Sequence, residues 1–349
     1  MMGWRFIAVV LAAGFLTACT EPPVALNPQP QPPVASPPKF ALRDFNASNT
    51  DHKIIRKAIC AELKIADAEL TQAHLAKVEK LDLFGTGVVD LSPVAALTGL
   101  QRLNIDANRV ADLTPVARLT VLEVLEASEN RITDLSPLSG LKRLKVLRLK
   151  QNVISDLTPL KQLPALLTLD LERNRLKDLT PLAGLSDLTW LALGMNRLDN
   201  LAPLADLRNL RHLYLERNRL TGASLSPLAN LRGLRSLSIR ENRVDDLSAL
   251  ADLEKMNWLE FDQNRVTDLG PLTGLAALQR VYMENNRVTV LLPLSRLAAL
   301  EELQGLGNEV PREQISLLER ALPKCKIRAG VFSKIPTRRD HRPGPPEKK

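Results

Sequence analysis

The chain contains little that points to catalysis. Only 3% of its 349 residues are aromatic, and its four histidines are far apart in the sequence: His52, His74, His212 and His341. It has no His-Glu-x-x-His zinc motif, no Gly-x-Ser-x-Gly nucleophile motif and no glycine-rich phosphate loop. We therefore expect no enzyme activity, no cofactor and no metal.

The positive charge of the chain is concentrated at one end. The net charge is +8, but residues 324–349 hold nine Lys and Arg against two acids (+7), so residues 1–323 carry only +1. This tail contains several prolines and few apolar residues, and we expect it to be disordered. It is either simply solvated or attracted to anionic lipids or envelope polymers. Without a basic stripe on the remaining chain, a nucleic-acid partner is not expected.

The dominant feature that is present is a repeat. Ten asparagines recur every 22 residues, apart from one interval of 24: Asn108, Asn130, Asn152, Asn174, Asn196, Asn218, Asn242, Asn264, Asn286 and Asn308. A fixed period of this length is typical of a solenoid. Residues 166–187 show the pattern L-x-x-L-x-L-x-x-N-x-L-x-D-L-x-P-L-x-x-L-x-x. The alternating Leu-x-Leu predicts a short strand, and the rest predicts a turn and a 3₁₀ or short helical return.

The polar residues of the repeat have expected structural roles. Stacked asparagines can satisfy the buried backbone groups of neighbouring coils, with Thr86 in the equivalent place of the first copy. Six copies have Ser or Thr before Pro, which predicts Ser or Thr as the N-cap of the return helix. An aspartate just before this turn is expected to bond to turn backbone, with calcium binding as the alternative. These aspartates are Asp90, Asp112, Asp134, Asp156, Asp178, Asp246 and Asp268.

These residues resemble the leucine-rich repeat family, in particular its 22-residue class of bacterial internalins. The resemblance covers about 70% of the chain, residues 78–321, or about eleven repeats. It implies an α/β solenoid: a leucine-rich repeat horseshoe with a parallel β-sheet on its concave side and 3₁₀ or short helices on its convex side. Residues 41–77 resemble the helical N-terminal cap that precedes such repeats.

Both ends of the array are expected to be capped. Apolar residues at helical spacing predict a helix over residues 51–63, with Asn49, Thr50 or Asp51 as its N-cap, and a second short helix after Thr71. A closing helix is expected over residues 312–321 and a last strand near residues 325–327. Residues 322–349 then comprise the end of this cap and the basic tail.

The first forty residues predict export. Residues 1–18 have the charged start, short apolar core and small residues of a signal peptide. The following Cys19 completes a Leu-Thr-Ala-Cys sequence that resembles the lipobox of bacterial lipoproteins, which implies lipid attachment at Cys19; the alternative is an ordinary signal peptide. Thr20 favours outer-membrane sorting. Residues 19–40 include eight prolines, which predicts a stiff linker between the lipid and the repeats.

The other two cysteines are expected in opposite caps. Cys60 and Cys325 would be separated by the whole sheet, whereas a disulfide needs Cα atoms within about 7 Å. We expect Cys60 to be a buried thiol. Cys325 is either buried or able to cross-link two copies. The protein is expected to be a monomer.

A candidate binding surface is marked by the scarce aromatic residues. Beyond the first 19 residues, every Trp and Tyr falls at a strand position that faces the concave side: Trp190, Tyr214, Trp258 and Tyr282. Neighbouring concave positions hold Arg211, His212, Glu216, Arg217, Arg240, Glu260 and Asp262. Aromatic residues and Arg within a polar surround are typical of protein-binding hot spots. The alternative is that the rings only cover apolar parts of the inner face.

A second feature is the Arg that follows most of the asparagines. It occurs eight times, and we expect it to alternate with acidic residues along one edge and keep the surface soluble: Arg109, Arg131, Arg175, Arg197, Arg219, Arg243, Arg265 and Arg287. The function expected overall is an envelope-anchored lipoprotein that binds a protein partner through its concave face. The alternative is a structural envelope protein that binds glycan or peptidoglycan through the tail and the arginine ridge.

Overall fold

The computed structural model describes residues 41–46 and 48–331. The expected signal peptide, the expected lipidation site Cys19, the proline-rich linker and the basic tail from residue 332 lie outside the described residues. All described residues fall within one compact unit.

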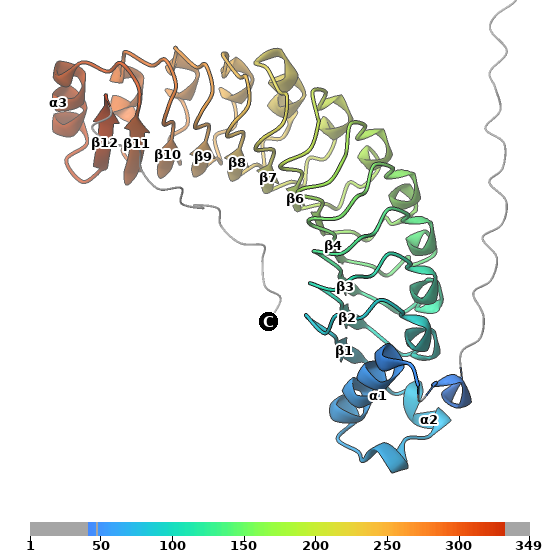
Figure 1. Ribbon diagram of the computed structural model, residues 1–349. Coiled ribbons are helices and arrows are strands. Elements are labelled where there is room, and N and C mark those ends of the chain that lie inside the picture. The colour runs from blue at the N-terminus through green and yellow to red at the C-terminus, as the bar shows by residue number, and fades with distance from the viewer. Residues whose placement is uncertain (1–40, 47, 332–349) are drawn as a thin grey trace, which may run out of the picture. The chain divides into compact units, whose positions relative to one another are not determined.

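Twelve strands form a single sheet in chain order (Figure 1). All are parallel, and each pairs with the equivalent residues of the next repeat, as Leu169 does with Leu191. This confirms the leucine-rich repeat solenoid. The strands are β1 Lys80–Asp82, β2 Arg102–Asn104, β3 Val124–Glu126, β4 Val146–Arg148, β5 Thr168–Asp170, β6 Trp190–Ala192, β7 His212–Tyr214, β8 Ser236–Ser238, β9 Trp258–Glu260, β10 Arg280–Tyr282, β11 Glu302–Leu306 and β12 Lys326–Gly330.

From each of β1 to β10 the chain returns through a short 3₁₀ helix on the outer side of the arc (Figure 1). The return helices are η3 Ser92–Ala96, η4 Thr114–Arg118, η5 Ser136–Leu138, η6 Thr158–Gln162, η7 Thr180–Leu182, η8 Ala202–Leu204, η9 Ala223–Asn230, η10 Ser248–Leu250, η11 Gly270–Leu272 and η12 Leu292–Arg296. Two further 3₁₀ helices, η1 Leu42–Asp44 and η2 Asp67–Glu69, lie in the N-terminal cap. The two-residue insertion between Asn218 and Asn242 lengthens η9 to eight residues.

The prediction that Ser or Thr caps the return helices is wrong. The N-cap position is a leucine, such as Leu179, and Ser or Thr is already the first helical residue, so its hydroxyl does not accept a capping bond. The preceding aspartate accepts it instead: Asp178 Oδ1 receives the backbone N–H of Thr180 at 2.8 Å. The same bond recurs at the other six predicted aspartates, which confirms their local role.

The asparagine ladder holds successive coils together as predicted. Asn174 Oδ1 accepts from the N–H of Ile154 in the preceding repeat at 3.0 Å. Its Nδ2 donates to the carbonyl of Leu149 in the preceding repeat, at 3.0 Å, and to that of Leu171 in its own, at 3.1 Å. The residue before nine of the ten asparagines, such as Arg173, has a left-handed φ of 53–57°, and Gly307 before Asn308 has a φ of 75°. The left-handed conformation costs roughly 1 kcal/mol per non-glycine residue, and the hydrogen bonds made by the asparagine offset that cost.

A continuous leucine core runs through the stack from the N-terminal to the C-terminal cap. The cap helices are α1 Thr50–Leu63, α2 Gln72–Leu75 and α3 Arg312–Ala321, which confirms all three expected helices. Asn49 is the N-cap of α1, where its side chain accepts from the N–H of Asp51. Cys60 is buried in α1, as expected.

Candidate functional site: a patch at the centre of the inner face

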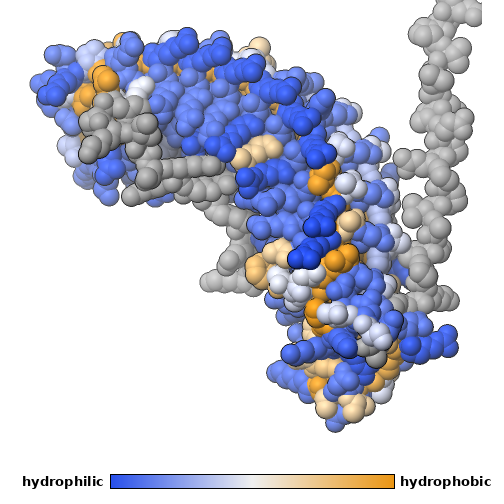
Figure 2. Space-filling model, in the orientation of Figure 1, coloured by the Kyte–Doolittle hydropathy of each residue, from blue (hydrophilic) through white to orange (hydrophobic). Residues whose placement is uncertain are grey.

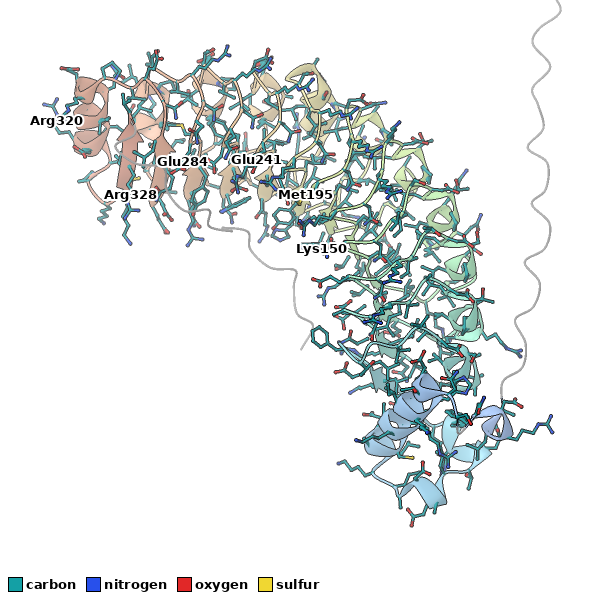
Figure 3. The ribbon with its side chains drawn as sticks, in the orientation of Figure 1. Lys150, Met195, Glu241, Glu284, Arg320 and Arg328 are labelled. Atoms are coloured by element: carbon teal, nitrogen blue, oxygen red, sulfur yellow. The ribbon has the colours of Figure 1, made fainter. Side chains whose placement is uncertain are left out.

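The inner face of the sheet is the face opposite the leucine core. Along β6 to β9 the middle residue of each strand, such as Leu191, belongs to the core, so the two flanking residues face the other way. The topology therefore brings the predicted site residues onto one face, although they come from repeats far apart in sequence. Figure 3 shows the labelled Lys150, Met195 and Glu284 along this inner side.

Four aromatic rings form a continuous row on the inner face. Trp190 and Tyr214 have ring centroids 5.5 Å apart, and Trp258 and Tyr282 are 5.9 Å apart. Tyr214 on β7 also meets Trp258 on β9 at 6.2 Å, although β8 lies between them. This contact is possible because the flanking residues of β8 are small serines, Ser236 and Ser238. With Ala192, the four rings make a hydrophobic cluster separate from the leucine core.

The rings are buried rather than exposed. The exposed fractions are 5% for Trp190, 0% for Tyr214, 3% for Trp258 and 4% for Tyr282. Both flanking positions of β6, β8 and β9 are buried, whereas the equivalent positions of β3 and β4 are half-buried. The Nε1 atoms of Trp190 and Trp258 are buried, and residues 41–46 and 48–331 offer them no hydrogen-bond partner. Two orphan donors on one face call for a physical explanation.

Carboxylates crowd beside the rings. Glu260 is 3% exposed and accepts from the Ser238 hydroxyl at 2.7 Å. Asp262 accepts from the backbone N–H of Glu284 at 2.6 Å. Burial, followed by the nearby charges of Glu260 and Glu284, raises the pKa of Asp262 to about 8. Glu284 follows β10 on the same face, and burial raises its pKa as well.

Glu216 is also buried, and glycine makes room for it. A Cβ atom at Gly194 would lie 2.5 Å from the Glu216 carboxylate, so this carboxylate rests directly over the backbone of the previous repeat. We call the four rings together with Glu216, Glu260, Asp262 and Glu284 the central patch. Figure 2 shows no single continuous apolar band on the visible surface; hydrophilic residues dominate it.

Only some of the predicted basic residues lie beside the carboxylates of the central patch. Arg240 lies beside the carboxylates, with Nη2 3.1 Å from Glu241 Oε1, and its charge lowers the pKa of Asp262 and Glu284. Arg217 bonds to the other oxygen of Glu241. Arg211 instead extends over Gly233 at the start of the strands, where its Nη1 would collide with a Cβ. It therefore sits at the edge, away from the carboxylates.

His212 is half-buried, and its Nδ1 is 3.1 Å from the Ser236 hydroxyl. Burial, then the charges of Arg235 and Arg211, lowers its pKa. The histidine is therefore neutral at physiological pH and contributes a polar contact rather than a charge.

Sequence reasoning missed part of this site. Asp262 was noted only as a neighbour, and Glu284, Gly194 and Ser238 were not singled out. The available signal was the run of small residues at strand flanks next to the aromatic positions: Ala192, Gly194, Ser236 and Ser238. Small residues on one strand leave space for large ones on the next.

Charged residues on the earlier strands form pairs between neighbouring repeats. Lys145 Nζ is 2.7 Å from Glu123 Oε2, and Lys150 Nζ is 3.2 Å from Glu172 Oε2. Arg148 also pairs with Glu126. These opposite-charge pairs stabilise adjacent strands and leave less free charge on this part of the inner face.

The expected alternation of the arginine ridge with acidic residues along one edge stays a prediction. All eight arginines are exposed, and within residues 41–46 and 48–331 none of them takes part in an ion pair. For six of the eight, the equivalent position in the next repeat holds another arginine; Val153 follows Arg131 and Glu309 follows Arg287. The nearby turn aspartates, such as Asp178, bond to their own turns instead.

Neither metal ligands nor a membrane span is found in the part of the chain that the structure describes. No group of three or more His, Cys, Asp or Glu there is placed to hold a metal ion. No helix among those residues is long and apolar enough to cross a bilayer.

Comparison with known proteins gives one family. The leucine-rich repeat model with two copies matches residues 120–162 and 142–184, and a second leucine-rich repeat model matches residues 164–220 and 208–266. No curated protein is matched by the sequence. A crystal structure of an internalin (inlF) from Listeria monocytogenes is 27% identical, with 82% of this chain and 91% of that chain covered and a TM-score of 0.69.

Two further solved structures are similar in fold alone. The functional domain of InlJ from Listeria monocytogenes is 18% identical over 79% of this chain and 67% of that one, with a TM-score of 0.59. The ectodomain of the Arabidopsis thaliana receptor kinase GASSHO1/SCHENGEN3, solved in complex with CASPARIAN STRIP INTEGRITY FACTOR 2, is 21% identical over 75% of this chain and 36% of that one, with a TM-score of 0.56.

Proposed function

Because the chain belongs to the leucine-rich repeat proteins and its repeats are of the bacterial internalin type, we propose that it is a binding scaffold that holds a protein partner on its central patch. A curved solenoid presents an extended concave surface, which is what such proteins use to bind macromolecules. Binding, rather than catalysis, also fits the absence of any catalytic motif from the sequence.

The observation that supports this proposal most is the pair of buried indole N–H groups of Trp190 and Trp258. A buried donor without an acceptor costs about 1–3 kcal/mol, so two on one face are expensive unless a ligand supplies acceptors. Carbonyl oxygens of a bound polypeptide are suitable acceptors. The rings beside them are at most 5% exposed and give the surface around these donors a rigid aromatic base.

The test is capture of a partner from the native envelope by the full chain. Glu216→Gln with Glu260→Gln changes the charge of the central patch but not its shape, and it should reduce capture strongly. Glu123→Gln with Glu126→Gln makes the same change just before and at the end of β3 and should leave capture unchanged. Circular dichroism checks that both variants are folded. Equal capture by the two variants contradicts a role for the central patch.

The proposed location is the bacterial cell envelope, through a lipid on Cys19. The support is the signal-peptide pattern of residues 1–18 and the lipobox resemblance at residues 16–19. The proline-rich residues 19–40 would hold the repeats away from the membrane at about 3.1 Å per residue. Cells fed a labelled fatty acid should label the wild-type protein and not Cys19→Ser; equal labelling contradicts the anchor.

A second candidate function has one observation in its favour, the ridge of eight exposed arginines, none of which forms an ion pair with another described residue. Regularly spaced guanidinium groups can bind the phosphate or carboxylate groups of an anionic envelope polymer. Replacing Arg197, Arg219 and Arg243 by Gln should then reduce salt-sensitive sedimentation with isolated cell wall. The same substitutions at Arg208, Arg232 and Arg296 provide a control of equal charge outside the ridge.

A further inference from the structure

We propose that the outer edge of β12 binds an extended segment of a partner protein in which acidic residues alternate with apolar ones. The bound segment adds one more strand to the sheet, at the end opposite the N-terminal cap. This surface is distinct from the central patch, so the inference goes beyond the proposed function and does not rest on it.

Backbone groups of β12 point away from the rest of the sheet. β12 is the last of the twelve strands and pairs with β11 over five residues. The N–H of Lys326 donates to the Glu301 carbonyl at 2.8 Å, on the β11 side. Because successive residues of a strand direct their N–H and C=O groups to opposite sides, those of Ile327 and Ala329 face away from β11. Such outward groups on an edge strand are the ones with which an added strand pairs.

The apolar core is also left partly uncovered at this edge. In the register of the sheet Ile327 follows Leu303, which is fully buried, yet Ile327 and Ala329 are only partly buried. At the opposite end of the sheet α1 packs against β1, and the equivalent Leu81 is 3% exposed. Helix α3 lies with β12 at the C-terminal end of the repeats (Figure 1), but it does not complete the cover, and its own Leu317 is 45% exposed.

The exposed side chains of β12 are basic. Lys326 and Arg328 are exposed, and the strand has no acidic residue. Neither forms an ion pair with another described residue. Glu302, the neighbour of Lys326 on β11, accepts instead from the Tyr282 hydroxyl at 3.1 Å and from the Gln304 amide at 2.9 Å. Carboxylates opposite the two bases on an added strand would make cross-strand pairs of opposite charge.

A second copy of this chain does not fit the edge. Antiparallel pairing of two β12 strands about a two-fold axis places bases against bases, and like charges opposite each other destabilise a sheet. Lysine on an edge strand is a common protection against such self-pairing. Residues 332–349 do not match in composition either, because they hold six bases against two acids, and their four prolines lack an N–H. The charge of β12 therefore selects an acidic strand from another protein.

The register of β12 defines the residues of the partner segment. Those opposite Lys326 and Arg328 should be Glu or Asp, and those opposite Ile327 and Ala329 should be apolar, so that they extend the leucine core by one layer. Ala329 is small and leaves room for a branched side chain beside it. A segment of about six residues, at about 3.3 Å per residue, spans the edge.

The probe is a fluorescently labelled peptide of six residues in which Glu and Val alternate. Its anisotropy should rise on titration with the full chain. Raising salt from about 0.1 M to about 1 M shortens the Debye length from about 10 Å to about 3 Å and should weaken binding. A peptide with Lys in place of Glu, and a block peptide of three Glu followed by three Val, should each bind at least about tenfold more weakly.

Reversing the charge of the edge should reverse this preference. Lys326→Glu with Arg328→Glu should lose the Glu-Val peptide and bind the Lys-Val peptide. Arg102→Glu with Arg280→Glu makes the same change at exposed positions of β2 and β10, inside the sheet, and should keep the wild-type preference. Circular dichroism checks that both variants are folded. A preference that is unchanged in the edge variant would overturn the proposal.

Amide hydrogen exchange followed by NMR shows whether the peptide pairs with the backbone. When the Glu-Val peptide is bound, the Ile327 and Ala329 amides should exchange at least about tenfold more slowly, whereas the Lys326 amide, already bonded to β11, should change little. Peptide binding without this protection contradicts an added strand. Slow exchange of the two amides before peptide is added also contradicts it: the edge then holds a second copy if dilution removes the protection, and another part of the same chain if it does not.

Discussion

Replacing Asn174 tests how the coils are held together. In Asn174→Ala, the N–H of Ile154 loses its acceptor in a buried position. The carbonyls of Leu149 and Leu171 each lose one donor but keep another, because Asn152 and Asn196 donate to them as well. One orphan amide costs about 1–3 kcal/mol and each of the two lost carbonyl bonds about 1 kcal/mol, so we expect a loss of roughly 3–5 kcal/mol.

The aspartate variant separates the two roles of this side chain. Asn174→Asp keeps an acceptor for Ile154 but cannot donate while ionised, and its charge faces the Leu149 and Leu171 carbonyl oxygens. At neutral pH it should be at least as destabilising as Asn174→Ala. It should recover stability in acid, where the protonated carboxyl can donate once more.

Denaturant unfolding gives the global loss, and hydrogen exchange at the Ile154 amide gives the local one, which matters because repeat arrays can unfold in parts. Asn209→Ala is the matched control: this exposed asparagine makes a single bond, to the Ser186 carbonyl. Its replacement should change stability by about 0.5 kcal/mol or less. If Asn174→Ala costs no more than Asn209→Ala, the role assigned to the asparagine ladder is refuted.

Three further predictions follow from other contacts. The pKa of Asp262 is about 8 in the folded protein and 3.8 in the unfolded chain, so the free energy of unfolding should fall as pH rises between these values. In denaturant unfolding, Asp262→Asn should make the free energy of unfolding depend less on pH. Asn49→Ala removes the N-cap of α1 and should cost about 1 kcal/mol in thermal unfolding. Burial raises the pKa of Cys325 to about 11 and also raises that of Cys60, so both thiols should react slowly with Ellman's reagent at pH 8 until urea is added.

The fold could be predicted because its cause is periodic. One 22-residue pattern fixes the strand, the leucine core and the asparagine bonds. Because the pattern occurs about eleven times, a copy that departs from it does not change the predicted fold. The expected helices at the two ends were correct for a similar reason, since each has its own apolar spacing. The last strand extends further than expected, to Gly330, because its backbone pairs with β11 over five residues.

The turn chemistry could not be predicted as well. Residue preference alone favoured Ser and Thr as helix caps, but the cap depends on where the 3₁₀ helix begins. Because it begins at Thr180 itself rather than after it, the acceptor must come from two residues earlier, and Asp178 supplies it. The left-handed residue before each asparagine was missed because Arg173 or Met195 carries no sequence signal for it.

The sequence indicated where the candidate site lies but not that its aromatic rings are buried. The alternation of strand residues placed Trp190 and Trp258 on the inner face. Their exposure depends on packing across three strands, where Ser238 leaves room for two rings to meet. This changes how the patch should be tested: truncating a buried ring to alanine costs about 3–5 kcal/mol and confuses binding with folding, whereas Glu→Gln substitutions avoid this.

The most direct test of the central claim, that the middle of the inner face contacts a partner protein, is site-specific photo-crosslinking in the native envelope. Arg280 is exposed at the start of β10, two residues before Tyr282, and Arg102 is exposed at the equivalent position of β2. A photoreactive amino acid at position 280 should cross-link to a partner, and one at position 102 should not. Equal yields at both positions, or none at either, would contradict the account.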